Sequence, residues 1–238
     1  MTANGAIGQA TGRRPPYGAM RPLSTQQRRD WQQATLATAP RPYGLDARLQ
    51  FWLEDLVWGQ ERTLPKFRAR EIVARTPYWA WEQAAYFLAG RVRDHSTRAR
   101  QLYDSLTETR TEQDNESWHI LILDELIAAR GIRENQVRYR LLPQLIALGV
   151  YQQFWILRLF NPARSYRLNA DVEDHAEQEY AALVAEHPEW ENEPFPSDVA
   201  PGYAPYESLA DLFRQIGADE GLHKELSLDR LAQGESTP

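Results

Sequence analysis

The sequence predicts an all-α protein built around one core, and three observations lead to this fold class. From Leu45 onward, apolar residues recur at helical spacing, the alternation of β-branched residues that marks strands is scarce, and prolines separate the periodic segments. A chain of 238 residues is long enough for one substantial domain, but not for two once its polar ends are set aside.

Helical periodicity places six helices along the chain. We expect them near residues 46–62, 67–92, 97–130, 134–160, 163–187 and 206–226. Pro162 fits the first turn of the fifth helix, Pro188 ends that helix, and the proline-rich stretch 194–205 connects it to the last. Pro143 falls inside the fourth segment, so that helix is either kinked there or begins only near that residue.

The two ends of the chain differ in composition from the middle. The first 29 residues hold five arginines and no acidic residue, with Gly, Pro and Thr between them, which is typical of a disordered arm. The helix-hostile pair Pro15-Pro16 favours a bacterial tail over an organelle transit peptide. We therefore expect a disordered arm over 1–40, the helical domain over 41–230 and a polar tail over 231–238.

Composition excludes several classes of function. Cysteine is absent, which excludes disulfides, thiolate zinc sites, iron–sulfur clusters and thiol catalysis. The 27 basic against 33 acidic residues make nucleic acid an unexpected partner. No run of about twenty apolar residues marks a helix that would span a membrane. Any metal ion must be held by Glu, Asp and His.

Two of the five histidines follow a glutamate by three residues, in Glu116-Ser-Trp-His119 and Glu220-Gly-Leu-His223. Residues three apart lie on one face of a helix, so a carboxylate and an imidazole at this spacing can converge on one ion. Two such turns can hold two ions if two further helices each supply an inward-facing carboxylate. The spacing therefore indicates a metal site that would need two more glutamates as ligands.

Glu173 is the candidate carboxylate in the second half of the chain, because it lies on a helix of its own between the two Glu-x-x-His turns. The first half offers Glu71 and Glu82, which lie in the same expected helix. Spacing alone does not choose between these two.

The order Glu, Glu-x-x-His, Glu, Glu-x-x-His resembles that of the alternative oxidases, and most closely their plastid terminal oxidase branch. The segment 71–81, EIVARTPYWAW, resembles the first ligand segment of that branch and favours Glu71 over Glu82. Asn115-Glu116-Ser-Trp-His119 resembles the second segment, and 161–180 resembles the third. Asp219-Glu220-Gly-Leu-His223 is similar to the fourth, whose Asp-Glu-x-x-His pattern is among the most specific in the family.

This resemblance implies a ferritin-like four-helix bundle with additional helices that binds two iron ions. Asn115 and Asp219 would support the ligands by hydrogen bonds, and Tyr180, seven residues after Glu173, matches the redox-active tyrosine of the family. The implied metal ligands are Glu71, Glu116, His119, Glu173, Glu220 and His223.

The implied activity is that of a quinol:oxygen oxidoreductase, a terminal oxidase that reduces O2 to water without pumping protons. The quinol ring would approach near Lys66 and Ala176, beside Glu173. The protein would be monotopic and a homodimer, on a bacterial cytoplasmic membrane or a thylakoid membrane, including that of a plastid. From its composition alone, we expect the apolar segment 141–160 to be a helix of the protein core. The resemblance instead implies that this helix is buried in one leaflet of the membrane.

Three alternatives remain open at this point. A di-iron hydroxylase or oxygenase acting on a quinone precursor or another lipid would use similar ligands. A ferritin-like iron-binding bundle would need neither an apolar entry face nor a redox tyrosine. A helical interaction module that has lost its metals is disfavoured because candidate ligands stand at all six positions.

Overall fold

The computed structural model describes residues 18–89 and 96–233, and within these ranges it contains helices and connections but no strand. The all-α prediction is confirmed. A π-helical turn, η1 (Val137–Leu141), leads into α6, and a 3₁₀ turn, η2 (Pro188–Glu191), follows α7. The α-helices are α1 (Thr25–Ala37), α2 (Leu45–Trp58), α3 (Leu64–Ala74), α4 (Thr76–Ala89), α5 (Ser96–Ala129), α6 (Leu142–Phe160), α7 (Pro162–Glu186), α8 (Ala200–Tyr203) and α9 (Leu209–Ala232).

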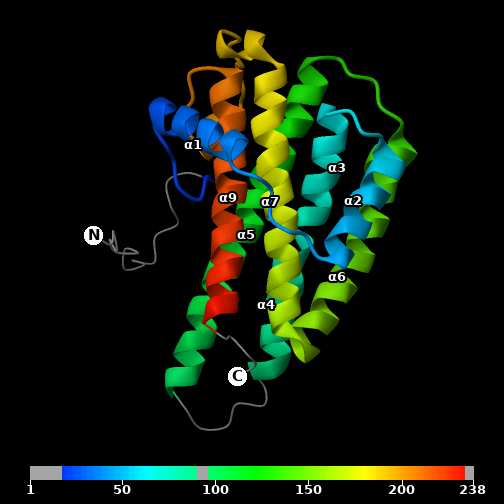
Figure 1. Ribbon diagram of the computed structural model, residues 1–238, viewed down its shortest axis with the longest axis vertical. Coiled ribbons are helices and arrows are strands. Elements are labelled where there is room, and N and C mark those ends of the chain that lie inside the picture. The colour runs from blue at the N-terminus through cyan, green and yellow to red at the C-terminus, as the bar shows by residue number, and fades with distance from the viewer. Residues whose placement is uncertain (1–17, 90–95, 234–238) are drawn as a thin grey trace.

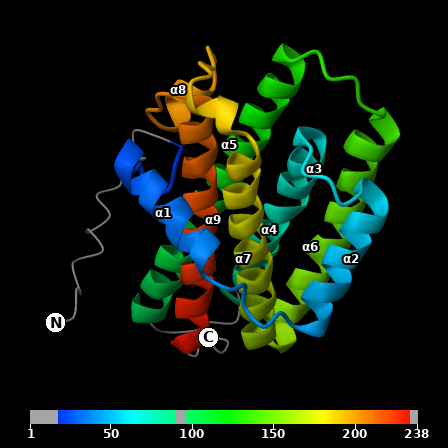
Figure 2. The same cartoon turned by 45° about the horizontal axis from the view of Figure 1, so that its top comes forward.

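A four-helix bundle forms the centre of the molecule (Figure 1). α7 packs along α9 more extensively than any other pair of described elements, and α3 and α4 together pack along α5. α1 crosses the outer side of α7 and α9, whereas α6 packs against α3, α4 and α7. Figure 2 shows α2 beside α6, at the opposite side of the bundle from α1. The predicted four-helix bundle with additional helices is therefore present.

The single helix expected over 67–92 is two helices, α3 and α4, which meet at Arg75. Pro77 explains the break, because its ring cannot donate a backbone hydrogen bond and clashes with the carbonyl four residues earlier. The Thr76 hydroxyl instead donates to the Val73 carbonyl oxygen at 2.7 Å. The break lies just after Glu71, so α3 ends close to one of the candidate ligands.

Proline also sets where α6 and α7 begin. Pro143 lies in the first turn of α6, which confirms the alternative in which the regular helix starts near this residue. Pro162 lies in the first turn of α7, as predicted, and the Asn161 side chain caps that helix by accepting a hydrogen bond from the Arg164 amide at 3.1 Å.

The disordered arm predicted over 1–40 is wrong for part of its length, because residues 25–37 form α1. Ser24 and Gln27 make a reciprocal capping box, and Arg28 is buried in an ion pair with Asp211 of α9. Composition missed this helix because its charged and polar side chains find their partners about two hundred residues away in the sequence rather than nearby. Residues 1–17 lie outside the described residues.

The predicted polar tail over 231–238 also begins too early, since α9 continues to Ala232. Residues 234–238 lie outside the described ranges. Among the described residues, no helix is long and apolar enough to cross a membrane. The 19-residue α6, the most apolar segment of the sequence, still falls short of that requirement.

Two apolar clusters enclose the polar interior of the bundle. One contains Ile122 and Leu126 of α5 and Phe213 of α9. The other joins Trp81 of α4 to Phe154 of α6. Apolar packing on both sides removes water from the segment of the bundle between them, where the candidate ligands lie.

Candidate metal centre

The structure brings together all six side chains that the sequence analysis named as ligands. α3 and α7 each contribute one glutamate, and α5 and α9 each contribute a glutamate and a histidine one turn apart. None of the six is more than 3% exposed. They are Glu71 of α3, Glu116 and His119 of α5, Glu173 of α7, and Glu220 and His223 of α9.

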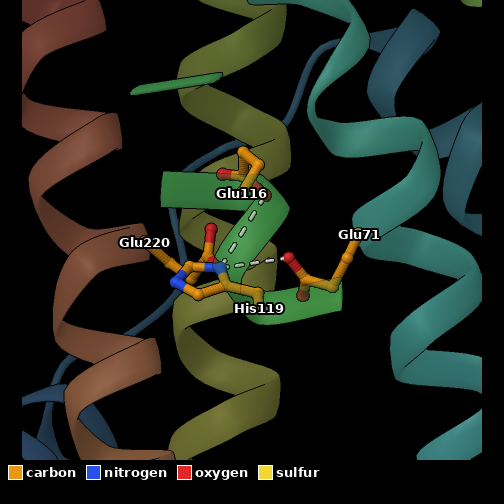
Figure 3. Close-up of side chains that lie close together, drawn as sticks. All are labelled: Glu71, Glu116, His119 and Glu220. Atoms are coloured by element: carbon orange, nitrogen blue, oxygen red, sulfur yellow. Dashed lines mark hydrogen bonds and ion pairs between the residues drawn. The ribbon is translucent and has the colours of Figure 1, made fainter. Parts of the chain in front are cut away.

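The six side chains form two overlapping groups, in each of which the candidate ligand atoms lie within 4.8 Å of one another. The first group is Glu71, Glu116, His119 and Glu220, as Figure 3 shows. The second is Glu116, Glu173, Glu220 and His223. Glu116 and Glu220 belong to both groups, so each could bridge two ions, while each group also has one glutamate and one histidine of its own.

Each histidine faces the shared glutamate of the other helix. His119 Nδ1 on α5 lies 3.0 Å from Glu220 Oε1 on α9, and 3.2 Å from Glu71 Oε2. His223 Nδ1 on α9 lies 2.8 Å from Glu116 Oε1 on α5. This crossed arrangement places both Nδ1 atoms toward the same interior space, which is the orientation that two metal-ligating imidazoles would need.

Several buried polar atoms of the centre have no hydrogen-bond partner in the protein. They are both carboxylate oxygens of Glu116 and of Glu220, Oε2 of Glu173 and both ring nitrogens of His223, whose approach to Glu116 is not in hydrogen-bond geometry. Buried polar atoms are rarely left unpaired, because this costs desolvation energy. Carboxylate and imidazole donors suit divalent iron, and four carboxylates balance the charge of two such ions. The residues therefore fit a pair of iron ions.

Burial and crowding perturb the ionisation of these groups. Burial raises the pKa of Glu116, and repulsion from Glu220 raises it further; burial and repulsion from Glu116 likewise raise the pKa of Glu173. Burial also acts on Glu220, but the attraction of the two neighbouring imidazoles, His119 and His223, outweighs burial and lowers the pKa of that carboxyl. Glutamates in one small space with pKa values displaced in opposite directions are typical of functional sites.

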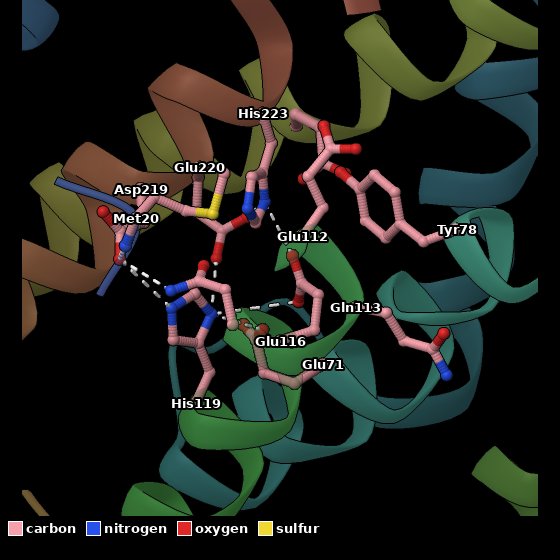
Figure 4. A network of polar contacts seen from close by, with 12 residues as sticks. Met20, Glu71, Tyr78, Glu112, Gln113, Glu116, His119, Asp219, Glu220 and His223 are labelled. Atoms are coloured by element: carbon pink, nitrogen blue, oxygen red, sulfur yellow. Dashed lines mark hydrogen bonds and ion pairs between the residues drawn. The ribbon is translucent and has the colours of Figure 1, made fainter. Parts of the chain in front are cut away.

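The outer nitrogen of His119 contacts a hydroxyl that belongs to a hydrogen-bonded group around Asp219; Figure 4 shows His119 and Asp219. His119 Nε2 lies 3.1 Å from the hydroxyl oxygen of Tyr203, and this hydroxyl donates to Asp219 Oδ2 at 2.7 Å. Asn115 Nδ2 donates to the same Asp219 oxygen at 2.8 Å. A hydrogen-bonded Nε2 keeps the proton there and leaves Nδ1 free to ligate. Asn115 and Asp219 thus lie where the sequence analysis expected, whereas Tyr203 was missed because no spacing relates it to a ligand.

Tyrosines donate hydrogen bonds to the two unshared glutamates. The Tyr180 hydroxyl of α7 donates to Glu71 Oε1 of α3, and the Tyr78 hydroxyl of α4 donates to Glu173 Oε1 of α7 at 2.7 Å. Each tyrosine follows one of these glutamates by seven residues and binds the other. Asn169 adds a second hydrogen bond to Glu173, at 3.1 Å. Tyr78 was not among the predicted site residues, because an aromatic run such as residues 78–81 is more often part of the core, although its seven-residue spacing from Glu71 was a usable signal.

Three other residues considered in the sequence analysis lie outside the two groups. Glu82 of α4 forms an ion pair with Arg110 at 2.8 Å and belongs to neither ligand group. Glu71 of α3 is the glutamate that lies with the other carboxylates. Lys66 is buried and donates to Asp55 Oδ1 at 2.7 Å, and Ala176 is also buried. Neither Lys66 nor Ala176 ligates, and their expected place beside quinol stays a prediction.

A cavity of about 390 Å³ lies between α3, α4, α5 and α6. Its wall includes Ile72, the residue after Glu71, and Ile120, the residue after His119. Arg75 and Trp79 line it from the junction of α3 and α4. Lys66 and Ala176 do not line this cavity, so it is a different space from the one expected to receive the quinol ring.

The chain matches the sequence model of one protein family, described as alternative oxidase, over residues 53–230. This match includes all six candidate ligands and covers well over half of the chain. A search among curated proteins found no match.

Proposed function

Because the chain belongs to the alternative oxidase family, we propose that it is a quinol:oxygen oxidoreductase that reduces O2 to water without pumping protons. The family carries out quinol oxidation at a di-iron centre. The observation that most supports the proposal for this chain is the pair of overlapping ligand groups that share Glu116 and Glu220. We also assign the chain to the plastid terminal oxidase branch, on the segment 71–81.

The overall reaction converts two quinols and one O2 into two quinones and two water molecules, so four electrons and four protons pass to oxygen. When bound, the two iron ions supply the place where O2 binds and receives electrons. The protein's part is to hold the six ligands in place, to exclude water and to deliver protons. Burial of all six ligands supports the exclusion of water.

Tyr180 is the residue that we propose as an electron and proton donor within the protein. Its ring is 1% exposed and packs against Phe67, with ring centroids 4.7 Å apart. Its hydroxyl donates to Glu71 Oε1, so the proton has an acceptor when the electron leaves. A quinol then returns one hydrogen atom to the tyrosine, which restores it. Burial raises the pKa of Tyr180, which keeps the phenol protonated between turnovers.

Quinol is proposed to reach the centre near Lys66 and Ala176. Lys66 lies on α3 and forms an ion pair with Asp55, near the end of α2. Ala176 lies on α7, three residues after Glu173. Lys66 thus contacts α2, and α2 packs against α7, the helix that carries Ala176. An approach from this side leads toward Glu173, as the resemblance implies.

Exposed apolar residues on α2 and α6 support a monotopic position on a membrane. On α2, Leu45, Leu49, Trp52 and Leu56 recur at helical spacing and are 57–82% exposed. Leu141, at the end of η1, and four residues of α6 are 49–82% exposed; the four are Leu145, Leu148, Ile156 and Phe160. Apolar stripes on neighbouring helices suit burial in one leaflet without a full span. We place the protein on a bacterial cytoplasmic or thylakoid membrane, as a homodimer.

Oxygen consumption tests the proposed activity. Membranes containing the protein are supplied with quinol, and O2 uptake, quinone formation and iron per chain are measured for the wild type and Glu220→Ala. Glu82→Ala is the matched control, since Glu82 is a glutamate of α4 outside both ligand groups. We expect quinol-dependent uptake with two irons per chain in the wild type and the control, and neither in Glu220→Ala.

Other results would redirect the assignment. Two bound irons without quinol-dependent uptake would exclude the oxidase. In that case a hydroxylated quinone precursor or lipid would indicate an oxygenase, and iron oxidation alone would indicate a ferritin-like role. Absence of iron from the wild type would exclude the metal centre itself.

Vesicle binding tests the monotopic position. The double variant Trp52→Gln, Leu56→Gln removes two residues of the α2 stripe and is expected to sediment less with lipid vesicles than the wild type does. Leu121→Gln is the control, because Leu121 is 50% exposed on α5, a helix that carries neither stripe. Equal sedimentation of all three proteins would refute the α2 surface as the membrane contact.

A further inference from the structure

Residues 18–23, here called the strap, lie far before the start of the family match at residue 53 and yet contact residues that adjoin the candidate ligands. The backbone of the strap runs beside α8: the Gly18 amide donates to the Gly202 carbonyl oxygen, and the Ala19 amide donates to the Tyr203 carbonyl oxygen, both at 2.9 Å. These bonds bring the strap against Tyr203, whose hydroxyl contacts His119.

The strap forms hydrogen bonds with Asp219 and Asn115. These two residues are linked to the outer nitrogen of His119 through the hydroxyl of Tyr203. The Met20 amide donates to Asp219 Oδ2 at 3.2 Å, and Figure 4 shows Met20 beside Asp219. The Gly18 carbonyl oxygen accepts from Asn115 Nδ2 at 2.9 Å. Asp219 Oδ2 therefore receives hydrogen bonds from the strap, from Asn115 and from Tyr203. Loss of the strap would remove one of these donors and the carbonyl that orients Asn115.

Two features hold the strap in this position. On its C-terminal side, α1 is anchored to the bundle by buried Arg28, which pairs with Asp211, and by Trp31, whose indole donates to Glu177 at 3.1 Å. On its N-terminal side, Gly18 fits closely against Trp118, the residue before His119. A Cβ atom at position 18 would lie 2.2 Å from the Trp118 ring, so only glycine allows this approach.

We infer that the strap is a positioning segment of the metal centre, which holds Asp219, Asn115 and Tyr203 so that His119 keeps Nδ1 directed at its ion. The inference rests on the proposed function in that it takes the six residues as iron ligands. It adds that residues outside the family match set the affinity of one of the two ions, the one held by the group of His119. Among the described residues, no hydrogen bond joins the strap to Glu173 or His223, the two candidate ligands that belong to the second group alone.

Two substitutions act on the strap through different contacts. Gly18→Ala introduces the Cβ that would clash with Trp118, and Met20→Pro removes the amide that donates to Asp219. The control is Gly149→Ala, at an exposed glycine of α6 whose added Cβ would meet nothing within 4 Å. All proteins are full-length, loaded anaerobically with Fe(II), and mixed with a chelator that reports free Fe(II).

We expect one of the two irons to leave each strap variant about 10- to 100-fold faster than it leaves the wild type, because loss of a residue that supports a ligand weakens binding by this factor. The other iron should leave at the wild-type rate. In the Mössbauer spectrum of the loaded variants, the signal of one iron should change and that of the other should not. Gly149→Ala should match the wild type in both measurements.

The remaining outcomes overturn the inference or separate it from the proposed function. Wild-type release of both irons from both strap variants would refute it. Faster release of both irons together with a lower melting temperature of the metal-free protein would show that the strap supports the fold and not one ligand. Selective loss of one iron in a protein that does not oxidise quinol would uphold the strap and refute the oxidase.

Discussion

Replacement of Tyr78 by phenylalanine tests whether the two halves of the centre are held separately. Glu173 Oε1 accepts hydrogen bonds from the Tyr78 hydroxyl at 2.7 Å and from Asn169 at 3.1 Å, while Oε2 has no partner in the protein. The variant leaves only the longer bond, from an amide that also contacts Ser227. Glu173 would then be free to turn away from the ion of its group.

A hydrogen bond to a charged group contributes about 1.5–3 kcal/mol of free energy. Only the difference in this contribution between the iron-bound and the iron-free protein changes the affinity for iron. We therefore expect the ion of the His223 group to bind about 10- to 100-fold more weakly in Tyr78→Phe. The phenylalanine ring can keep the contacts of Tyr78 with Trp81 and His223, whose ring centroids lie 5.4 Å away. The variant should thus fold, and the effect should appear in metal binding.

Anaerobic Fe(II) titration measures the affinity of each ion, and a double-mutant cycle identifies which one changes. In a His223→Ala background, which lacks a ligand of the affected ion, Tyr78→Phe should have little further effect on the remaining ion. Tyr180→Phe should instead weaken the ion of the Glu71 group. Equal weakening of both ions by Tyr78→Phe, or the same effect in both backgrounds, would refute separate support of the two halves.

Three further predictions concern stability. Arg230→Met leaves the fully buried Glu112 without its ion-pair partner, and urea denaturation should show a free energy of unfolding lower by about 3–5 kcal/mol. Removal of iron by a chelator should lower the melting temperature, because the ions bind the folded chain and not the unfolded one. Hydrogen bonding to Arg214 lowers the pKa of Glu191 below 4.5, the usual value for a glutamate. The ionised carboxylate therefore stabilises the folded state at pH values above 4.5, and this stabilisation is lost as the pH falls through the lowered pKa. Glu191→Gln should therefore flatten the acid side of a plot of melting temperature against pH.

The two tyrosines show how local spacing and tertiary contact combine in this protein. Tyr180 and Tyr78 each lie two helical turns after a candidate ligand, and that relation can be read along the chain. Their hydrogen bonds, however, cross to the glutamate of the other helix, because α3 and α4 face α7 across the bundle. A search for paired spacings would have found Tyr78, but not the glutamate that it contacts.

Sequence alone was sufficient for the features that depend on one helix at a time. Apolar periodicity predicted the helical segments of the bundle, although it joined α3 and α4 into one helix. Pro162 predicted where α7 begins, and Pro143 gave the start of α6 as one of two alternatives. The i, i+3 spacing of Glu116 with His119 and of Glu220 with His223 placed each pair on one helical face. Such features follow from bonds and angles between near neighbours, which the order of residues determines directly.

Only the tertiary structure decided the features that join distant parts of the chain. Spacing did not distinguish Glu71 from Glu82; the bundle does, because α3 brings Glu71 to the centre whereas Glu82 pairs with Arg110. The segment 18–37 looked like part of a disordered arm because the first 29 residues contain no acidic residue and the segment lacks an apolar stripe. Its partners, such as Asp211 and Asp219, lie nearly two hundred residues away and contact it only in the folded bundle.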